Sequence, residues 1–280
     1  MEAVTKKFID VEDVIRSKNP SLAKYLPGFL LRYLKRIVHE DEVNDFIRRH
    51  GHRTSFDFVD SIVEEFKIGV AVKGSENIIK TGGCIFASNH PLGGLDAMAL
   101  IQEIGKHRRD LKFIVNDILL QLKNLEEIFI GVNKHGKNSA EALEAMDNLY
   151  KSEMATMIFP AGLVSRKIDG VIKDLMWRKS FISKAKKFNR TIVPVHIAGA
   201  NSNFFYNLAN FRKNIGIKAN IEMLYLMDEM YHQAGKTVTL TFGKPIPPST
   251  FTDMLNDGEW ADKMRDYIYE LAEDPNAMFS

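Results

Sequence analysis

The stretch Cys84-Ile-Phe-Ala-Ser-Asn-His-Pro-Leu-Gly-Gly-Leu-Asp96 decides how the rest of the sequence is interpreted. Its first four residues form an apolar run that is typical of a buried strand. A polar turn and a glycine pair follow, and from Asp96 the pattern is that of a helix. A strand, a turn and a helix in this order place side chains at the carboxyl end of a sheet strand, where open α/β proteins bind their ligands. The sequence therefore predicts a ligand site here.

Two residues of this stretch, His90 and Asp96, form the candidate catalytic pair. A histidine can accept a proton near neutral pH, and a carboxylate can orient its ring. The spacing alone is weak evidence, because His39 is followed by Asp45 at the same interval in charged, helix-like surroundings. His90 is selected because it follows an apolar strand and precedes a glycine turn.

The chain after residue 68 alternates between strand-like and helix-like segments. The predicted strands are 69–72, 84–87, 111–115, 128–132, 157–159, 191–197 and 237–242, and the predicted helices are 96–105, 139–151, 170–188 and 258–273. This alternation favours an α/β fold with a mixed, mostly parallel sheet that is covered by helices on both faces. The sequence predicts one main domain at 69–280, preceded by an N-terminal helical extension at 1–68.

The N-terminal extension contains apolar residues at helical spacing between positions 22 and 38, with basic residues between them. The pair Pro27-Gly28 is expected to split this region into a short helix and a longer one. Two interpretations are open for the apolar face. It packs on the main domain, or it forms a basic amphipathic segment that rests on an anionic membrane.

The composition is ordinary for a soluble globular protein, with 45% hydrophobic and 26% charged residues among 280. A net charge of +2 is too mild to indicate nucleic-acid binding. The single cysteine, Cys84, excludes an intramolecular disulfide and a cysteine-rich metal site, and its apolar strand favours a core position. We find no secretory signal pattern and no membrane-spanning stretch, so we expect a cytoplasmic chain.

Two further turns carry polar residues at the ends of predicted strands. The first strand, 128–132, runs into a loop that begins with Asn133 and Lys134. This loop could bind an anionic headgroup, or it could be a solvated turn that caps the next helix through Asn138 or Ser139. The second, 157–159, runs into Pro160 and a glycine turn. We expect the hydrogen-bond donors of Ser165, Arg166 and Lys167, which follow this turn, to point outward.

A proline interrupts the predicted strand 191–197 at Pro194, which suggests an edge strand or a bulge. His196 in the same strand is more readily interpreted as a hydrogen-bonded core residue than as a ligand. Beyond these turns, a basic run from Lys173 to Arg190 could contact anionic lipid or an acidic carrier protein, or form the solvated face of an amphipathic helix.

With these motifs in order, residues 70–250 resemble the glycerolipid acyltransferase superfamily, which includes the lysophosphatidate acyltransferases. The block from Ser88 to Asp96 resembles the family's Asn-His-(x4)-Asp motif, and 159–166 resembles its Phe-Pro-Glu-Gly-Thr-Arg-Ser motif. The segments 193–195 and 243–246 resemble two later motifs. The nearest resemblance is to hemolysin-like bacterial members, some of which look like O-acyltransferases that make amino-acid-containing lipids.

The resemblance implies transfer of an acyl group from acyl carrier protein or acyl-CoA to the hydroxyl of a lysolipid, at the inner membrane surface. It implies no metal and no cofactor besides the acyl donor, and no nucleic acid as a partner. The catalytic residues implied are His90 and Asp96. The substrate-binding residues implied are Asn89, Gly93, Gly94, Asn133, Lys134, Phe159, Pro160, Gly162, Ser165 and Arg166.

Three departures from the family pattern bear on the acceptor. Five residues separate His90 from Asp96 where the family has four, so the loop must bulge, with the glycine pair as its expected place. Asn133 and Lys134 stand in place of an arginine, and Ala161 in place of a glutamate. In the family those two residues belong to the pocket for glycerol 3-phosphate or its lyso form. A lipid hydrolase with the same pair of residues, and a non-catalytic module that binds lipid or acyl carrier, are the alternatives.

Overall fold

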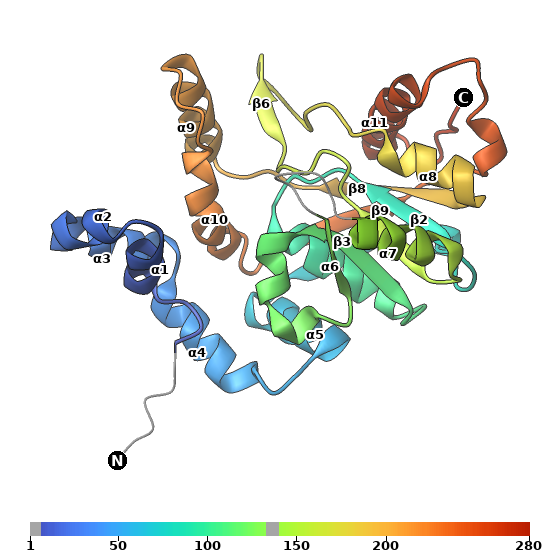
Figure 1. Ribbon diagram of the computed structural model, residues 1–280. Helices are drawn as coiled ribbons and strands as arrows, with labels where there is room; N and C mark the ends of the chain where they lie inside the picture. Colours follow the sequence, from blue (N-terminus) through green and yellow to red (C-terminus); the bar gives the residue numbers. More distant parts are fainter. Residues whose placement is uncertain (1–6, 133–139) are drawn as a thin grey trace. The chain divides into compact units, whose positions relative to one another are not determined.

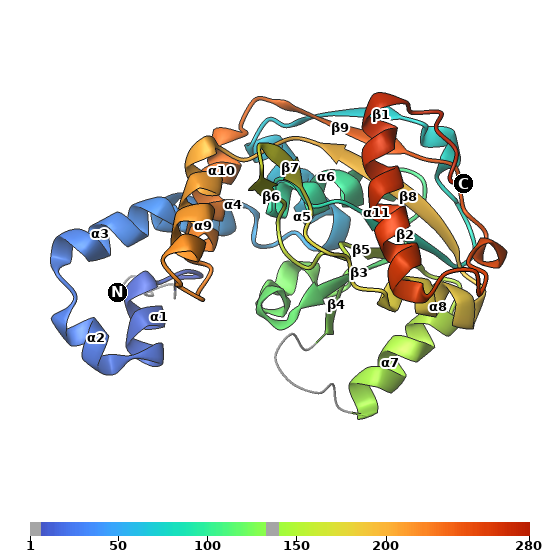
Figure 2. The same cartoon turned by 90° about the horizontal axis from the view of Figure 1, so that it is seen from above.

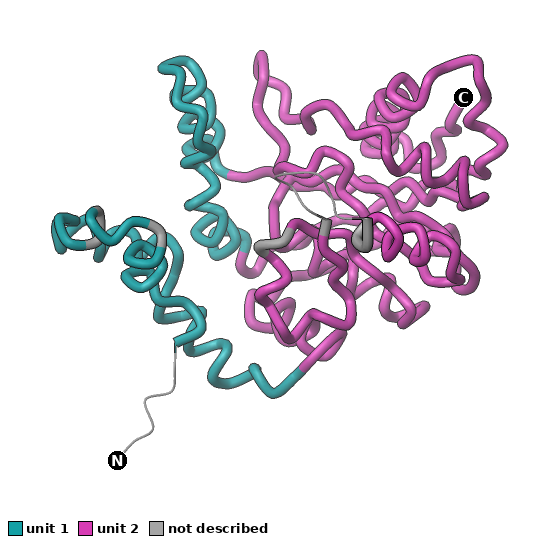
Figure 3. Tube along the Cα trace, viewed as in Figure 1, with its two compact units in different colours: residues 1–53, 202–233 teal, residues 54–201, 234–280 magenta. Residues whose placement is uncertain are grey.

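The structure of the chain is a computed structural model that describes residues 7–132 and 140–280. Two compact units divide the chain: the first joins the N-terminal part up to Arg53 with Ser202–Gln233, and the second joins Thr54–Asn201 with Ala234–Ser280 (Figure 3). This division differs from the predicted boundary between residues 68 and 69. Helix α5 (Ser55–Glu65) falls in the second unit, and a later segment joins the first.

The second unit contains a mixed sheet of seven strands, in the order β1-β9-β8-β2-β5-β3-β4. Its strands are labelled in Figure 2. All neighbouring pairs are parallel except β8 and β9. The strands are β1 (Gly69–Lys73), β2 (Cys84–Ser88), β3 (Leu111–Asn116), β4 (Phe129–Val132), β5 (Ala155–Ile158), β8 (Thr191–Ala198) and β9 (Thr237–Phe242). The predicted mostly parallel sheet is therefore confirmed, and each predicted strand agrees with an observed one to within two residues at either end.

Pro194 does not mark a sheet edge, because β8 lies between β9 and β2. The last residue pair between β8 and β9 is Val195 with Phe242, so Pro194 lies just beyond that ladder. Its carbonyl still accepts the Gly243 N–H at 2.8 Å. The missing N–H of the proline therefore falls where β9 has ended, and a central strand tolerates it.

Helices cover both faces of the sheet, as predicted (Figures 1 and 2). On one face, α8 and α11 pack with Ile85 and Ala87 of β2 in a buried cluster that also includes Tyr150 of α7. Side chains alternate along a strand, so the residues between them face α5 and α6 on the other side. The helices of this unit are α5 (Ser55–Glu65), α6 (Gly94–Gly105), α7 (Ala140–Lys151), α8 (Ser180–Phe188) and α11 (Asp257–Glu273), with short 3-10 turns η1 (Ser75–Asn77), η2 (Asp117–Gln121), η3 (Lys123–Leu125) and η5 (Pro248–Thr250).

The predicted helix 170–188 is wrong in its first half. Residues Arg166–Ile168 (β6) and Val171–Lys173 (β7) form a separate antiparallel hairpin, and the helix begins only at Ser180. The hairpin turn is Asp169-Gly170, and both residues have positive φ, 50° and 82°. A two-residue turn with this geometry matches the twist of the paired strands, and glycine adopts it without strain.

The first unit is helical and draws on two distant parts of the sequence. Its elements are α1 (Val11–Lys18), α2 (Pro20–Tyr25), α3 (Gly28–Ile37), α4 (Glu40–His50), α9 (Asn203–Asn214), η4 (Ile221–Tyr225) and α10 (Leu226–His232). The predicted break at Pro27-Gly28 is confirmed. Within the unit, the Nε2 atom of His39 lies 3.0 Å from Asp228 Oδ1, and the His39 ring stacks on Tyr231 at 3.9 Å. The helices α9 and α10 had no counterpart among the predicted elements.

Candidate active site

The candidate site lies where β2 ends and α6 begins, at the carboxyl edge of the parallel strands. His90 Nδ1 lies 2.9 Å from Asp96 Oδ2, and the same oxygen accepts the N–H groups of Leu92 and Gly93 at 2.8 and 3.1 Å. Three N–H donors that converge on one oxygen favour a carboxylate, so Nδ1 carries the proton of the ring. Nε2 is then the free basic atom.

Asp96 is completely buried, and burial raises the pKa of its carboxyl group while the hydrogen bond from His90 lowers it. Among the described residues, its second oxygen, Oδ1, has no hydrogen-bond partner. The hydrogen bonds that the carboxylate accepts within the described residues therefore all come from the loop that carries His90. The carboxylate accepts from that loop through one oxygen alone.

Phe159 supports the His90 ring from one side. The two rings stack with their centroids 4.2 Å apart and their planes 14° from parallel, and Phe113 packs edge-on against Phe159. The His90 side chain remains 17% exposed. No hydrogen bond to Nε2 is present in the described part of the chain, so this atom can receive a proton from a substrate.

Gly93 forms the turn between His90 and Asp96. Its φ of 84° lies in a region that favours glycine, and it turns the chain into α6 immediately before Gly94. The N–H of Gly93 donates to Asp96 Oδ2. The N–H of the exposed Gly94 donates to no acceptor among the described residues.

Asn89 and Ser165 hold the loops of the site together, and the prediction that the donors of Ser165 and Arg166 point outward is wrong. The Asn89 amide exchanges two hydrogen bonds with the backbone of Ile197 in β8, at 2.7 and 2.9 Å. The Ser165 hydroxyl is fully buried and donates to Asp174 Oδ1 at 2.5 Å. Arg166 is also buried, and its Nη1 donates to the Val164 carbonyl at 2.7 Å.

The remaining predicted substrate residues divide into two groups. Pro160 and Gly162 shape the turn after Phe159: the Pro160 carbonyl accepts the Arg178 N–H, and Gly162 has φ 63°. Asn133 and Lys134 lie outside the described residues. Their proposed contact with a headgroup stays a prediction.

The basic run from Lys173 to Arg190 is largely neutralised by neighbouring groups. Lys184 and Lys187 pair with Asp147, and Arg190 is buried against backbone carbonyls of the 149–154 segment. Lys186 pairs with Asp257. These ion pairs favour the interpretation that the basic residues form the solvated face of a helix. They disfavour the interpretation that these residues bind a carrier protein.

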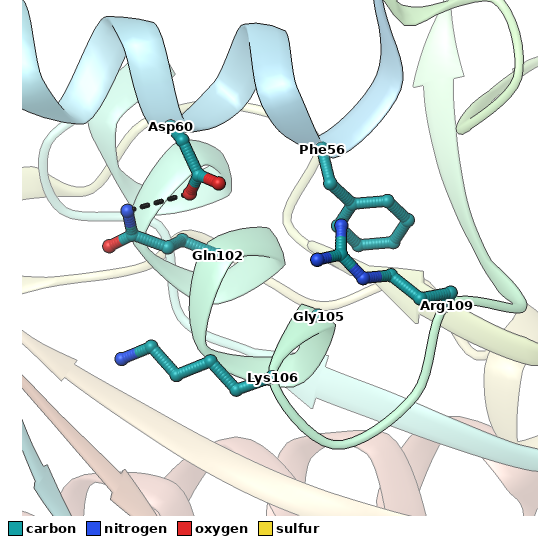
Figure 4. Close-up of a pocket in the computed structure, with 6 residues that line it drawn as sticks. All are labelled: Phe56, Asp60, Gln102, Gly105, Lys106 and Arg109. Atoms are coloured by element: carbon teal, nitrogen blue, oxygen red, sulfur yellow. Dashed lines mark hydrogen bonds between the residues drawn. The ribbon is translucent and has the colours of Figure 1, made fainter.

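A small polar pocket lies at the other end of α6 from His90 (Figure 4). Phe56, Gly105 and Arg109 form part of its wall, with the Arg109 guanidinium 4.6 Å from the centre of the Phe56 ring. The Gln102 amide donates to Asp60 at 2.9 Å. The pocket contains no histidine and is not part of the His90 site.

Cys84 and His196 are core residues, as predicted. Cys84 is fully buried, and burial raises the pKa of its thiol to about 11, which makes it a poor nucleophile. His196 is buried in β8 near the Tyr269 ring, and burial lowers the pKa of its imidazole to about 4. It is neutral at physiological pH.

The sequence reasoning missed Asp174 and Tyr269. The Asp174 carboxylate accepts the backbone N–H of His90 at 3.2 Å. The backbone N–H of Asp174 donates to the Tyr269 hydroxyl at 2.8 Å. Burial raises the pKa of the Asp174 carboxyl, and the hydrogen bonds from Ser165 and Trp177 oppose this. The available signal was Asp169-Gly170, a dipeptide that is typical of a two-residue hairpin turn, and such a turn would have placed Asp174 beside Ser165.

Comparison with known proteins assigns the chain to a family. A family model described as "Acyltransferase" matches residues 13–272. The chain belongs to this acyltransferase family. Two relatives are named lyso-glycine lipid O-acyltransferase: that of Bacteroides thetaiotaomicron is 45% identical over 94% of this chain and 97% of its own, and that of Phocaeicola vulgatus is 43% identical over 94% and 95%.

One solved structure is also similar to this acyltransferase. It is the 1-acyl-sn-glycerophosphate acyltransferase PlsC of Thermotoga maritima, with 18% identity, 93% and 91% coverage of the two chains and a TM-score of 0.46. Within residues 7–132 and 140–280, no group of three or more His, Cys, Asp or Glu side chains could hold a metal ion. In the same residues, no helix has both the length and the apolar character that crossing a bilayer requires.

Proposed function

We propose that this acyltransferase moves a fatty acyl group from a thioester, on acyl carrier protein or coenzyme A, to the hydroxyl of a lyso-amino-acid lipid such as a lyso-glycine lipid. The observation that carries the proposal is the pair His90 and Asp96, hydrogen-bonded at 2.9 Å. The identity of 45% to the Bacteroides lyso-glycine lipid O-acyltransferase along nearly the whole chain supports the acceptor class.

The proposed chemistry needs one base and no protein nucleophile. The acceptor hydroxyl oxygen attacks the thioester carbonyl carbon while His90 Nε2 takes the hydroxyl proton. Asp96, bonded to Nδ1, holds the tautomer and stabilises the imidazolium that forms. The tetrahedral intermediate then expels the thiolate, which receives the proton from Nε2. The unused N–H of Gly94 is a candidate donor to the oxyanion.

An acyl-transfer assay with the purified chain tests this proposal. Acyl carrier protein and coenzyme A thioesters serve as donors, and a lyso-glycine lipid, lysophosphatidate and glycerol 3-phosphate serve as acceptors. We expect a diacylated product with the lyso-glycine lipid, identified by mass spectrometry. Free fatty acid without an acylated product would indicate the hydrolase alternative, and tight lipid binding without any product would indicate the binding module.

The surface that meets the lipid is proposed to be the tip of the β6–β7 hairpin. Ile168 and Val171 face each other across this hairpin and are 50% and 62% exposed. Residues at the base of the same hairpin contact the backbone of His90. Apolar side chains exposed at the tip of a hairpin whose base contacts the His90 backbone are suited to the interfacial region of a bilayer.

Replacing Ile168 and Val171 together with serine is expected to weaken binding to anionic lipid vesicles roughly tenfold or more, because two aliphatic side chains no longer enter the interface. Flotation with phosphatidylglycerol vesicles measures the bound fraction. Met254→Ser is the matched control, since Met254 is an exposed apolar residue of the same unit that lies outside the hairpin. Equal flotation of the double variant and the control would contradict the proposed surface.

A further inference from the structure

Asp174 is a buried carboxylate at the centre of a hydrogen-bond network beside His90. It directly follows β7 and is 5% exposed. Its Oδ1 accepts the His90 N–H at 3.2 Å and the Ser165 hydroxyl at 2.5 Å, and its Oδ2 accepts Trp177 Nε1–H at 3.0 Å. Both carboxylate oxygens therefore have donors. The network connects the hairpin, the segment before α8 and the His90 loop.

The base of the β6–β7 hairpin holds the backbone of His90 from both of its polar groups. The His90 N–H donates to Asp174, and the His90 carbonyl accepts the Ser165 N–H at 2.8 Å. Ser165 directly precedes β6 and Asp174 directly follows β7. The first residue pair of the hairpin is Arg166 with Lys173, so Ser165 and Asp174 lie next to this pair on the two strands. The fixed separation of the two strands fixes the position of His90.

This arrangement supplies a restraint that Asp96 and Phe159 do not. Those two residues act on the imidazole, through the bond to Nδ1 and the stacked ring. The imidazole can make both contacts only if the Cα atom of His90 is correctly placed. The position of that Cα is set by the hydrogen bonds of the His90 backbone to Asp174 and Ser165. A misplacement of about 1 Å can cost on the order of 10²-fold in rate.

Stability alone gives little reason for a carboxylate at this position. A buried charge carries a large desolvation cost, and hydrogen bonds from several donors are needed to offset it. An apolar residue would avoid that cost but could not accept from the His90 N–H. We propose that Asp174 is a positioning residue of the reaction, which fixes the His90 backbone so that Nε2 faces the acceptor hydroxyl. This inference rests on the proposed role of His90 as the base.

The test compares Asp174→Ala with Asp110→Asn in the full chain. Asp110 also makes a carboxylate network, with Arg108 at 2.7 Å, but it lies directly before β3 at the opposite edge of the sheet from His90. We expect kcat of Asp174→Ala to fall on the order of 10²-fold, with KM for both substrates changed by less than about threefold. Asp110→Asn is expected to keep kcat.

A second readout does not depend on turnover. The proton on His90 Nδ1 should give a downfield NMR resonance because of its bond to Asp96, and His90→Ala assigns it by its loss. We expect this resonance to broaden or move in Asp174→Ala and to persist in Asp110→Asn. A merely structural role of Asp174 would lower the unfolding temperature and leave the resonance in place.

The outcomes that overturn the inference are distinct from failure of the proposed function. An unchanged resonance in Asp174→Ala, or a kcat within about threefold of the parent, would overturn it. If the alanine variant does not fold, Asp174→Asn takes its place: the amide oxygen can occupy only one of the two carboxylate oxygen positions, so at least one of the three donors faces an NH₂ group, and a loss of about tenfold is expected under the same criteria. If no acyl product forms with the parent chain, the proposed function fails, while the resonance still tests the positioning.

Discussion

Replacement of His90 with alanine is expected to lower kcat for acyl transfer on the order of 10³-fold, because the acceptor hydroxyl loses its general base. The ring is held by Asp96 at Nδ1 and by Phe159 on one face, and Nε2 is the atom left for the substrate. The side chain is partly exposed and its removal leaves the sheet intact, so the fold should survive. Initial rates with product detection by mass spectrometry measure the loss.

His39→Ala is the matched control for this prediction. His39 is also bonded to an aspartate and stacked on an aromatic ring, but it belongs to the first unit. We expect its kcat to stay within about threefold of the parent. A His90→Ala enzyme that retained more than about a tenth of the parent kcat would rule out His90 as the base.

The sheet could be predicted from the sequence because its strands are short apolar runs bounded by turns. A strand buried on both faces is apolar along its length, as Cys84 to Ala87 of β2 are, and such a run followed by a glycine turn is a strong signal. The His90 site followed from the same pattern. It required that the carboxyl end of β2 meet the start of α6, which is a property of open α/β sheets and not of any one residue pair.

The loop contacts could not be predicted because their residues look like surface residues. Ser165, Arg166 and Asp174 are polar but buried: Ser165 and Asp174 bond to each other and to the His90 backbone, and Arg166 donates to the Val164 carbonyl. Such burial depends on partners distant in sequence, as Asn89 and Ile197 also illustrate. The basic residues that follow suggested one long helix, although Asp169-Gly170 favours a turn.

The contacts of Asp96 separate its orienting role from its electrostatic role. Oδ2 accepts three N–H groups, from His90, Leu92 and Gly93, while Oδ1 has no hydrogen-bond partner among the described residues. In Asp96→Asn the amide oxygen must take the Oδ2 position, because an NH₂ group there would face three donors. The tautomer of His90 is then preserved, and the negative charge alone is lost.

Asp96→Asn is therefore expected to lower kcat on the order of 10²-fold, through weaker stabilisation of the imidazolium, and Asp96→Ala on the order of 10³-fold. The alanine variant should also unfold at a lower temperature, because three buried N–H groups lose their acceptor at about 1–3 kcal/mol each. Steady-state rates and thermal unfolding measure the two effects.

Asp60→Asn provides the control for the loss of a carboxylate that bonds to α6 away from His90. Asp60 accepts from Gln102 near the other end of that helix, in the pocket of Figure 4, and its replacement should leave kcat unchanged. If Asp96→Asn and Asp96→Ala were equally slow, the geometry set by Asp96 would account for its whole effect. If Asp96→Asn matched the parent, the charge would contribute nothing, and stabilisation of the imidazolium would have to come from another group.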